Sequence, residues 1–557
     1  MSGDLKSLEL STVPMRSKSQ AGKRLRFSAS VLVSFLLVSS FAAWNLSTWP
    51  ARIRYPGDED YEGVVLATMI HMRQGVPVYA AGAASGFDGA TYGPLFYLLG
   101  EHLINAEKPS YVPLRLLSVL AMLGCAAGCG VLAFLLTGSR FAASLSPITF
   151  LGYGVVSGCG IQALSDGVSL FLFFSGFLLA YRFRNSRGVL LAVPLMTLGF
   201  YYKPQYIAGP LAVLIFLFLE KRYRLAAQFT GLLAFSGIGM FALFQWGVFR
   251  GQAFWQHFLL YQSSALSWQL LGRGLFFIAV VFLLPGLFVL EYLRESSNRL
   301  LACYFSSALL LGLISFCKDG SGPHYFFELF LFVSVLIPVL LARRLKQHVF
   351  PLDFALLLGI MLLTGQWLKD PCPRKADVKR WESMQGFLRR SFPTHAVALG
   401  FYPGELLQAG LSTPFGSLFE LAEFSRRGVV SEDGLVSYIR NRRFAVIVMT
   451  LKVDTQYDSY WAEFCTPRIL AAINGNYRLE TSLDMPTPER LGHLSRYYIY
   501  VPRPGVTNSA SQVPISSIPS CNPNKGWRRS PRAGRDRYKL YLSLLGLEAR
   551  DGDVHDG

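Results

Sequence analysis

Charged residues are scarce in this sequence. Asp, Glu, Lys and Arg make up 16% of the 557 residues, whereas 52% of the residues are hydrophobic, including 43 Phe. So large an apolar fraction exceeds what the core of a soluble protein needs. The composition therefore predicts a polytopic membrane protein, with the lipid bilayer as its main surroundings.

Acidic residues are scarcer than basic ones. The chain has 35 Asp and Glu against 53 Lys and Arg, a formal net charge of +18. In a soluble protein this excess would indicate binding to nucleic acid. Here the basic residues fall in short clusters between apolar runs and in the two tails, a pattern typical of membrane topology. We therefore expect no nucleic-acid partner.

Several functional motifs are missing. The eight cysteines fit neither a zinc spacing nor a disulfide framework, although Cys372 and Cys465 could pair in an oxidising compartment or both stay free. There is no glycine-rich phosphate loop and no nucleophile elbow. No internal repeat is apparent, which disfavours a transporter built from repeated halves.

About eleven apolar runs approach the roughly 20 residues that a helix needs to cross a bilayer. They lie near residues 27–47, 113–137, 141–159, 166–182, 188–201, 204–220, 224–246, 273–294, 299–317, 324–342 and 349–367. The runs on either side of Tyr202-Lys-Pro204 are short, so they could form one broken helix plus a partner.

The basic residues also predict the orientation, because Lys and Arg accumulate in short cytoplasmic loops. If the N-terminus is cytoplasmic, the short inner loops hold twelve Lys and Arg and the short outer loops hold three. With an odd number of spans, the first outer loop at 48–112 and the C-terminal region then both lie outside. The first span could instead be a secretory signal cleaved near Ser40-Phe-Ala-Ala43, but the arm before it is long for that role.

These patterns divide the chain into four parts. They are a cytoplasmic basic arm at 1–26, a transmembrane module at 27–369, an extracytoplasmic α/β domain at 370–503 and a disordered tail at 504–557. The fold class is thus a polytopic α-helical membrane protein, with about 11 transmembrane helices and a small C-terminal α/β domain.

The C-terminal domain is predicted from alternating short apolar runs and helical stretches. Strands are expected at 396–400, 445–450 and 497–501, and helices at 432–443 and 460–474. The domain carries no catalytic motif, so we assign it packing or acceptor recognition.

An acidic segment, Gly57-Asp-Glu-Asp-Tyr-Glu62, follows the first span. The outer loop that contains it is too long for a simple turn, and long ordered loops tend to carry function. Asp60 to Arg73 predicts an amphipathic helix at the membrane surface. Carboxylates at the start of such a helix are favoured by its dipole, so capping and catalysis both explain them.

Further motifs follow this acidic segment in a set order. They are Gly75-Val-Pro-Val-Tyr79, Tyr92-Gly-Pro-Leu-Phe-Tyr97, Ala163-Leu-Ser-Asp166, Tyr202-Lys-Pro-Gln205 and Gly320-Ser-Gly-Pro-His-Tyr-Phe-Phe-Glu328. The order resembles the integral-membrane glycosyltransferases of the GT-C class over about residues 27–500. The protein O-mannosyltransferase, aminoarabinose transferase and rhizobial lipopolysaccharide glycosyltransferase branches are the most similar. The chain departs from the class in two places. Its acidic segment can be aligned in several ways with the usual Asp-Glu pair, and His324 stands where Asn is common.

The resemblance implies a sugar carried on a polyprenyl phosphate and attacked by an acceptor hydroxyl. A carboxylate must orient or deprotonate the acceptor, and a cation must offset charge on the departing phosphate. We expect Asp58 to be the base, supported by Glu59 or Asp60. Lys203 is expected at the donor phosphate, with Lys318 as the second choice, although Lys203 could also be an interfacial lysine.

Five further residues are expected to bind substrate. They are Tyr92, Asp166, His324, Tyr325 and Glu328. Asp166 could equally cap the helix that it begins. His324 and Glu328 are expected on one helix face, where hydrogen bonding is favoured over zinc because a third ligand is missing locally. We predict no cofactor and no metal site, although some members of the class use a divalent metal and the acidic segment could hold one.

These expectations predict a glycosyltransferase on the extracytoplasmic face of a bacterial inner membrane. It would move a hexosyl or pentosyl group from a polyprenyl-phosphate carrier to a hydroxyl or amine of a glycan, lipid or protein acceptor. Inversion is favoured, because one direct attack needs only one base. The rival hypotheses are a flippase for a lipid-linked sugar and a polytopic scaffold whose outer domain binds a partner.

The orientation can be tested with reporter fusions. Fusions after residues 58 and 450 should be active only with a periplasmic reporter, and fusions after residues 184 and 222 only with a cytoplasmic one, because the basic loops stay inside. A cytoplasmic signal at residue 58 would contradict the assignment.

Overall fold

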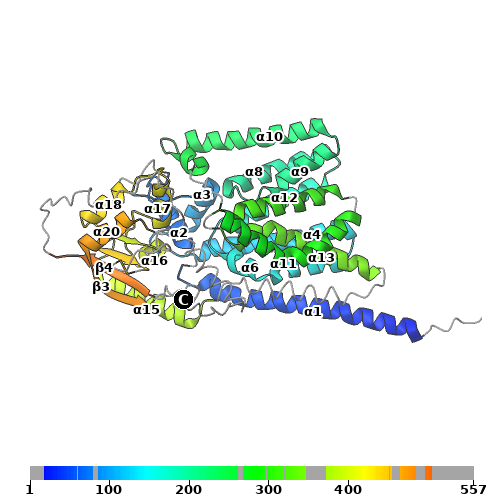
Figure 1. Ribbon diagram of the computed structural model, residues 1–557, viewed down its shortest axis with the longest axis horizontal. Helices are drawn as coiled ribbons and strands as arrows, with labels where there is room; N and C mark the ends of the chain where they lie inside the picture. Colours follow the sequence, from blue (N-terminus) through cyan, green and yellow to red (C-terminus); the bar gives the residue numbers. More distant parts are fainter. Residues whose placement is uncertain are drawn as a thin grey trace, which may run out of the picture.

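The computed structural model describes residues 18–58, 61–79, 86–260, 267–295, 298–318, 321–346, 372–450, 452–453, 465–484 and 496–504. Several expected features lie outside these residues: Glu59, Asp60, the last span at 349–367 and the tail from 505 onward. Figure 1 shows a helical bundle with a smaller α/β part at one end.

The bundle is built from long apolar helices that follow the expected spans. They are α1 (Lys18–Arg54), α4 (Val112–Thr137), α5 (Arg140–Gly152), α6 (Gly154–Gly158), α7 (Asp166–Arg182), α8 (Val193–Tyr202), α9 (Ala208–Leu219), α10 (Tyr223–Ala242), α11 (Trp268–Glu295), α12 (Arg299–Phe316) and α13 (Phe327–Lys346). Short 3-10 or π-helical segments, η1 to η5, adjoin some of them at Cys159–Ile161, Arg187–Ala192, Leu243–Val248, Gln256–Leu260 and Pro323–Phe326.

Within the described residues, four helices are long and apolar enough to cross a membrane, or up to six if each of two bent pairs is one span. The shorter apolar helices at Arg187–Tyr202 and Ala208–Leu219 fit the expected break near Lys203. The chain is therefore a mostly helical membrane protein, and the number of about eleven spans remains a prediction.

Burial separates the inside of the bundle from its edge. In the apolar window of the span that includes α13, 94% of the residues are buried, against 11% for α10. In Figure 1, α10 and α1 run along opposite edges of the bundle, and α13 lies between them. Because α10 presents Phe235 and Ile238 outward, it is suited to contact with lipid.

The bend between α5 and α6 leaves backbone carbonyl groups that find hydrogen-bond partners on another helix. The two helices meet at 70°, and such a bend leaves carbonyl groups without helical partners. The amide of Asn45 on α1 donates to two of them, at Leu151 and Gly152, over 3.1 and 2.8 Å. This polar contact fixes α1 against α5 in an otherwise apolar interior.

The C-terminal part is a three-layer α/β/α arrangement. Its elements are α15 (Lys375–Ser391), β1 (Ala398–Gly400), α16 (Pro403–Gln408), α17 (Leu418–Arg426), α18 (Asp433–Arg440), β2 (Val446–Met449), α20 (Pro467–Asn476), β3 (Tyr477–Asp484) and β4 (Arg496–Pro502). The strand order is β1-β2-β4-β3, with β1 and β2 parallel and the other pairs antiparallel.

Alternation along β2 explains why both faces of this sheet are covered. Val446 and Val448 pack with residues of α15 and α16, whereas Ile447 and Met449 pack with residues of α17, α18 and α20. Successive side chains of a strand point to opposite faces, so an apolar run of four residues needs a layer on each side. The expected strands at 396–400, 445–450 and 497–501 coincide with β1, β2 and β4, whereas β3 was not expected.

The first outer loop lies between the bundle and the sheet. It contains α2 (Glu62–Arg73) and α3 (Pro94–Leu103), and Phe87 forms a parallel bridge with Phe415 of the C-terminal part. The helix expected at Asp60 to Arg73 is therefore present, but its expected place on the membrane surface is wrong. Every residue from Glu62 to His71 is buried, because α2 packs between α3 and α16 rather than lying on lipid.

Arg115 joins the end of α1, the acidic segment and the start of α4. Its guanidinium donates to the backbone carbonyls of Arg52, Tyr55 and Gly57 at 2.8, 2.5 and 3.0 Å, and it forms a two-point ion pair with Glu62. Both side chains of the ion pair are at most 1% exposed. Glu62 also accepts from the backbone N–H of Ala163 at 2.5 Å.

We expect Arg115→Ala to destabilise the protein by about 3–5 kcal/mol, because removing one partner leaves the Glu62 charge buried and unpaired. Thermal unfolding of the protein in detergent measures the loss. The matched control is Arg299→Ala, whose ion pair with Glu220 is exposed and should contribute about 1 kcal/mol or less. Equal losses in the two variants would contradict a structural role for Arg115.

Candidate functional site

Asp58 is buried just before α2, where it caps the helix. It is 2% exposed, and its Oδ2 accepts a hydrogen bond of 2.7 Å from the backbone N–H of Gly63. A helix start favours a carboxylate through its unpaired N–H groups and its dipole. Gly63 has no room for a β-carbon, which would collide with the Asp58 carboxylate. The capping role that the sequence allowed is therefore present, and it fixes how this carboxylate points.

Lys203 and Asp166 form a second buried group. Lys203 Nζ donates to Asp166 Oδ1 at 2.7 Å, and the Tyr206 hydroxyl donates to the same oxygen at 2.5 Å. Lys203 is 8% exposed and Asp166 2%. Within the described contacts, the Asp166 carboxylate pairs with these side chains and does not cap α7, so the geometry does not support the capping alternative for this residue.

The chain reaches this geometry because Lys203 precedes a proline. A residue before proline is driven out of the helical region, and Lys203 has φ −159° and ψ 116°. Helix α8 therefore ends at Tyr202 and α9 begins only at Ala208. The Ser169 hydroxyl contacts the backbone carbonyl of Lys203 at 3.0 Å, which ties the break to α7.

Aromatic rings flank the Lys203 ammonium. The ring of Tyr92 lies 5.1 Å from Nζ and that of Tyr325 5.6 Å, both within the range of cation–π attraction. Tyr92 is placed by Gly93, whose N–H donates to the carbonyl of Tyr202 at 3.1 Å. A β-carbon at Gly93 would collide with the carbonyl of Tyr201, so this close approach requires glycine.

His324 completes the same group. It precedes α13 in the 3-10 segment Pro323–Phe326, its backbone carbonyl accepts from Tyr206 at 3.3 Å, and its ring packs on Tyr325. Five residues expected from four separate motifs thus meet in one place: Tyr92, Asp166, Lys203, His324 and Tyr325. Tyr206 was missed, although its position three residues after Lys203, across the proline, was a signal available in the sequence.

Two expected residues lie elsewhere. Glu328 faces the backbone N–H groups of Ala208 and Gly209 at the start of α9, together with the Tyr304 hydroxyl. The expectation that His324 and Glu328 share one helix face is wrong, because His324 lies in the 3-10 segment before α13. Lys318 follows α12, and within the described residues no contact joins it to the Lys203 group.

The Asp58 and Lys203 groups are separate but connected. The Tyr61 ring packs edge-on against Tyr92, with centroids 5.9 Å apart. Glu62 holds the backbone N–H of Ala163, three residues before Asp166. The acidic segment therefore sets the position of the residues that lead to Asp166, and the two groups form one connected region at the end of the bundle that meets the α/β part (Figure 1).

The α/β part contributes residues that no sequence motif predicted. Glu405 on α16 accepts from the Tyr497 hydroxyl at 2.5 Å, and the backbone N–H of Asp58 also hydrogen bonds to its carboxyl. Burial raises the pKa of Glu405 to about 7, and these two hydrogen bonds offset part of the rise. Its partners are 347 and 92 residues away, so local sequence could not reveal them.

A further titratable group lies between α2 and α17. Burial raises the pKa of Glu420 to about 8, opposed in part by a hydrogen bond with Tyr61. Nearby, burial alone would lower the pKa of His71, but the Asp88 carboxylate, 2.6 Å from Nδ1, outweighs burial and raises it. These groups bring the outer loop and the α/β part into one buried polar interface.

The described residues contain no group of three or more His, Cys, Asp or Glu side chains placed to hold a metal ion. Cys372 and Cys465, which could have paired, are both free thiols.

No family model matches the sequence, and no curated protein matches it significantly. The crystal structure of ArnT from Cupriavidus metallidurans in the apo state is similar to this chain, with a TM-score of 0.51 and 12% sequence identity over 87% of this chain and 98% of that one. The chain has the fold of a GT-C glycosyltransferase. At this identity the likeness establishes the fold alone, and it confirms the resemblance expected from the order of motifs.

Two other solved structures are less similar. ArnT from C. metallidurans bound to undecaprenyl phosphate gives a TM-score of 0.49, with 12% identity over 86% of this chain and 98% of that one. The apo oligosaccharyltransferase from Archaeoglobus fulgidus gives 0.43, with 12% identity over 88% of this chain and 75% of that one. With TM-scores below 0.5, neither adds to the assignment of the GT-C fold.

The buried acids predict a stability that falls with rising pH. A carboxyl whose pKa is raised by folding stabilises the folded state below its unfolded pKa, near 4.5, and this contribution is lost as the pH rises through its folded pKa. For Glu405 and Glu420 the loss extends to about pH 7 and 8. His71 acts in the same direction, since its raised pKa favours the protonated form in the folded protein.

We expect the melting temperature in detergent to fall between pH 5 and pH 8.5, and Glu420→Gln to reduce that fall. The control is Glu480→Gln, whose carboxylate on β3 is 43% exposed and stays in contact with water. An unchanged fall in Glu420→Gln would contradict the assignment.

Proposed function

We propose that this protein is a glycosyltransferase that moves a sugar from a polyprenyl-phosphate carrier to an acceptor hydroxyl or amine. The reaction would take place on the extracytoplasmic face of a bacterial inner membrane, with the N-terminus in the cytoplasm. The observation that carries the proposal is the buried Lys203–Asp166 pair, set between two tyrosine rings at a helix break. The GT-C fold supports the same reading.

Lys203 has the chemistry to receive the donor phosphate. An ammonium binds phosphate as a point charge and has three N–H donors, of which Asp166 takes one. A buried ion pair is expensive to maintain, since both charges lose their hydration, so it is weak evidence for stability alone. A cation kept in place by Asp166 and Tyr206 before the carrier arrives is pre-organised to offset charge on the departing phosphate.

Asp58 is the proposed base. The acceptor oxygen attacks the anomeric carbon, the bond from that carbon to the phosphate oxygen breaks, and the acceptor proton passes to the Asp58 carboxylate. The N–H of Gly63 holds one oxygen of that carboxylate, which restricts its orientation as base catalysis requires. Glu59 and Asp60 stay candidates for a supporting role, and one direct attack would invert the anomeric configuration.

The remaining assignments follow from position. Tyr92, His324 and Tyr325 lie around Lys203 and would contact the donor sugar or its phosphate. Glu328 and Lys318 are weaker candidates, because no described contact joins either of them to Lys203. The C-terminal part, at 370–503, is proposed to recognise the acceptor beside the outer loop. The donor sugar would be a hexose or pentose, and the acceptor a glycan, a lipid or a protein.

The proposal is tested with Asp58→Asn and Lys203→Met in cells that lack the native protein. Asp58→Asn should lower sugar transfer by about 10²- to 10⁴-fold, the usual contribution of a general base, while the lipid-linked donor accumulates. Lys203→Met should also impair transfer, because it removes the cation. Mass spectrometry of envelope glycans and of extracted lipid-linked sugars measures both effects.

Arg299→Ala, at an exposed ion pair far from this region, is the control and should transfer normally. Normal transfer in Asp58→Asn would overturn the proposed function. If the sugar lipid fails to cross the membrane in the deletion strain and Asp58→Asn restores its passage, the protein is a flippase. If only deletion of residues 372–501 has an effect, it is a scaffold.

A further inference from the structure

The contact between α16 and the acidic segment is unusually close. Gly404 and Gly63 face each other, and a β-carbon on Gly404 would lie 2.8 Å from the α-carbon of Gly63 and would collide with the Tyr111 hydroxyl. The amide of Gln408 donates to the carbonyl of Pro56 at 2.9 Å. Two side chains of α16 therefore contact the backbone near Asp58: Gln408 binds the Pro56 carbonyl, and Glu405 contacts the Asp58 N–H two residues later.

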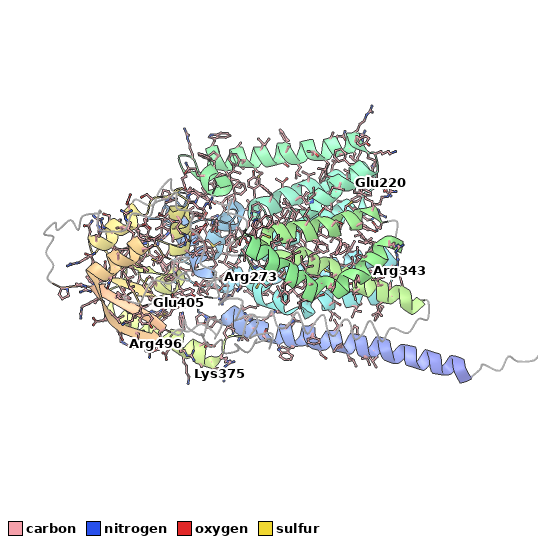
Figure 2. The ribbon with its side chains drawn as sticks, in the orientation of Figure 1. Glu220, Arg273, Arg343, Lys375, Glu405 and Arg496 are labelled. Carbon is pink, nitrogen blue, oxygen red and sulfur yellow. The ribbon has the colours of Figure 1, made fainter. Side chains whose placement is uncertain are left out.

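Glu405 is the member of this contact that reaches Asp58. Its carboxyl takes hydrogen bonds from the backbone N–H of Asp58 and from the Tyr497 hydroxyl. It is 2% exposed and lies in the α/β part near its border with the bundle (Figure 2). Burial raises its pKa to about 7, so near neutral pH part of the Glu405 population is uncharged. A second full negative charge there would oppose the first.

The surroundings of Glu405 leave its carboxyl little freedom. The Tyr111 hydroxyl before α4 interacts electrostatically with Asp58, Glu405, Glu62 and Arg115. The Tyr497 hydroxyl on β4 interacts with Glu405, Tyr402 and Tyr55. Arg115 is engaged by Glu62 and by three backbone carbonyls. Gln385 on α15 holds the backbone carbonyl of Glu405 at 2.8 Å, which fixes α16 without contacting Asp58.

Asp58 is thus held from two sides. The Gly63 N–H of its own helix binds its carboxylate, and the Glu405 carboxyl of the α/β part binds its backbone N–H. Displacing a catalytic group by about 1 Å can cost about 10²-fold in rate. We propose that Glu405 is a positioning residue for Asp58, through which the C-terminal part sets the orientation of the candidate base.

This inference rests on the proposed function, and it goes further by making the C-terminal part necessary for the chemical step as well as for acceptor recognition. A purely structural role predicts a different pattern, in which loss of Glu405 reduces folding and carrier binding together. The distinction lies in whether rate and binding change separately.

The test compares Glu405→Ala, Glu405→Gln and Asp58→Asn in the full-length protein in detergent. The donor is the lipid-linked sugar extracted from cells lacking the protein, transfer is measured to envelope material of the same cells, and binding is measured with undecaprenyl phosphate. We expect Glu405→Ala to lower the maximal transfer rate about 10- to 100-fold while undecaprenyl phosphate binding changes less than about twofold. Glu405→Gln keeps an oxygen acceptor for the Asp58 N–H and should restore the rate to within about threefold of the native protein.

Hydrogen–deuterium exchange provides a readout that does not depend on activity. The peptide containing the Asp58 amide should exchange faster in Glu405→Ala than in the native protein and in Glu405→Gln. Glu480→Gln, which changes an exposed carboxylate on β3 of the same α/β part, is the matched control and should leave the exchange and the transfer rate unchanged.

The outcomes separate the two proposals. If Asp58→Asn transfers normally, the proposed function fails, and with it this inference. If Asp58→Asn is inactive but Glu405→Ala transfers at the native rate or exchanges at the native speed, the positioning role alone is overturned. A loss of rate in Glu405→Ala that Glu405→Gln does not restore, or that is matched by lost carrier binding, also overturns it.

Discussion

The ion pair between Arg115 and Glu62 is the interaction on which the rest of the candidate site depends. One guanidinium reaches the end of α1, the turn before Asp58 and the first residue of α2. Through Glu62 it also reaches the chain that leads to Asp166. Because burying both charges is costly, the pair is stable only while every remaining donor and acceptor is satisfied. The same requirement fixes the backbone on either side of Asp58, so the carboxylates of Asp58 and Glu62 have defined positions.

Much of the site follows from local rules that can be read in the sequence. Proline after Lys203 breaks the helix, and glycine before Pro94 lets Tyr92 approach that break. Both motifs can be read in the sequence, and the resemblance that they support predicts Tyr92 and Asp166 at the substrate and Lys203 at the donor phosphate. The three residues come from the outer loop, the start of α7 and the end of α8, so the fold was needed to show that they touch.

Other parts could not be predicted, for reasons that lie in particular residues. β3 alternates poorly because it is an edge strand, with most of its residues at least partly exposed. Helix α2 looked like a surface helix because it carries Glu62, Thr68 and His71, but each of these polar groups has a buried partner. Glu405 acts across 347 residues of chain. Sequence periodicity indicates which residues are buried locally. It does not indicate which distant side chain offsets the free-energy cost of burying a polar group.

The two halves of the candidate site solve different physical problems. In the proposed function, Lys203 must keep a positive charge in a buried place until a phosphate arrives. Asp166 provides the counter-charge, and the Tyr206 hydroxyl donates a hydrogen bond to Asp166. At Asp58 the proposed base must keep one orientation. Its carboxylate accepts from the Gly63 N–H of α2, and its backbone N–H contacts Glu405 of the α/β part. A base placed by groups from two parts of the chain responds when either part moves. Under the proposed function, this arrangement would couple the chemical step to whatever the α/β part binds, which a base placed by the bundle alone would not do.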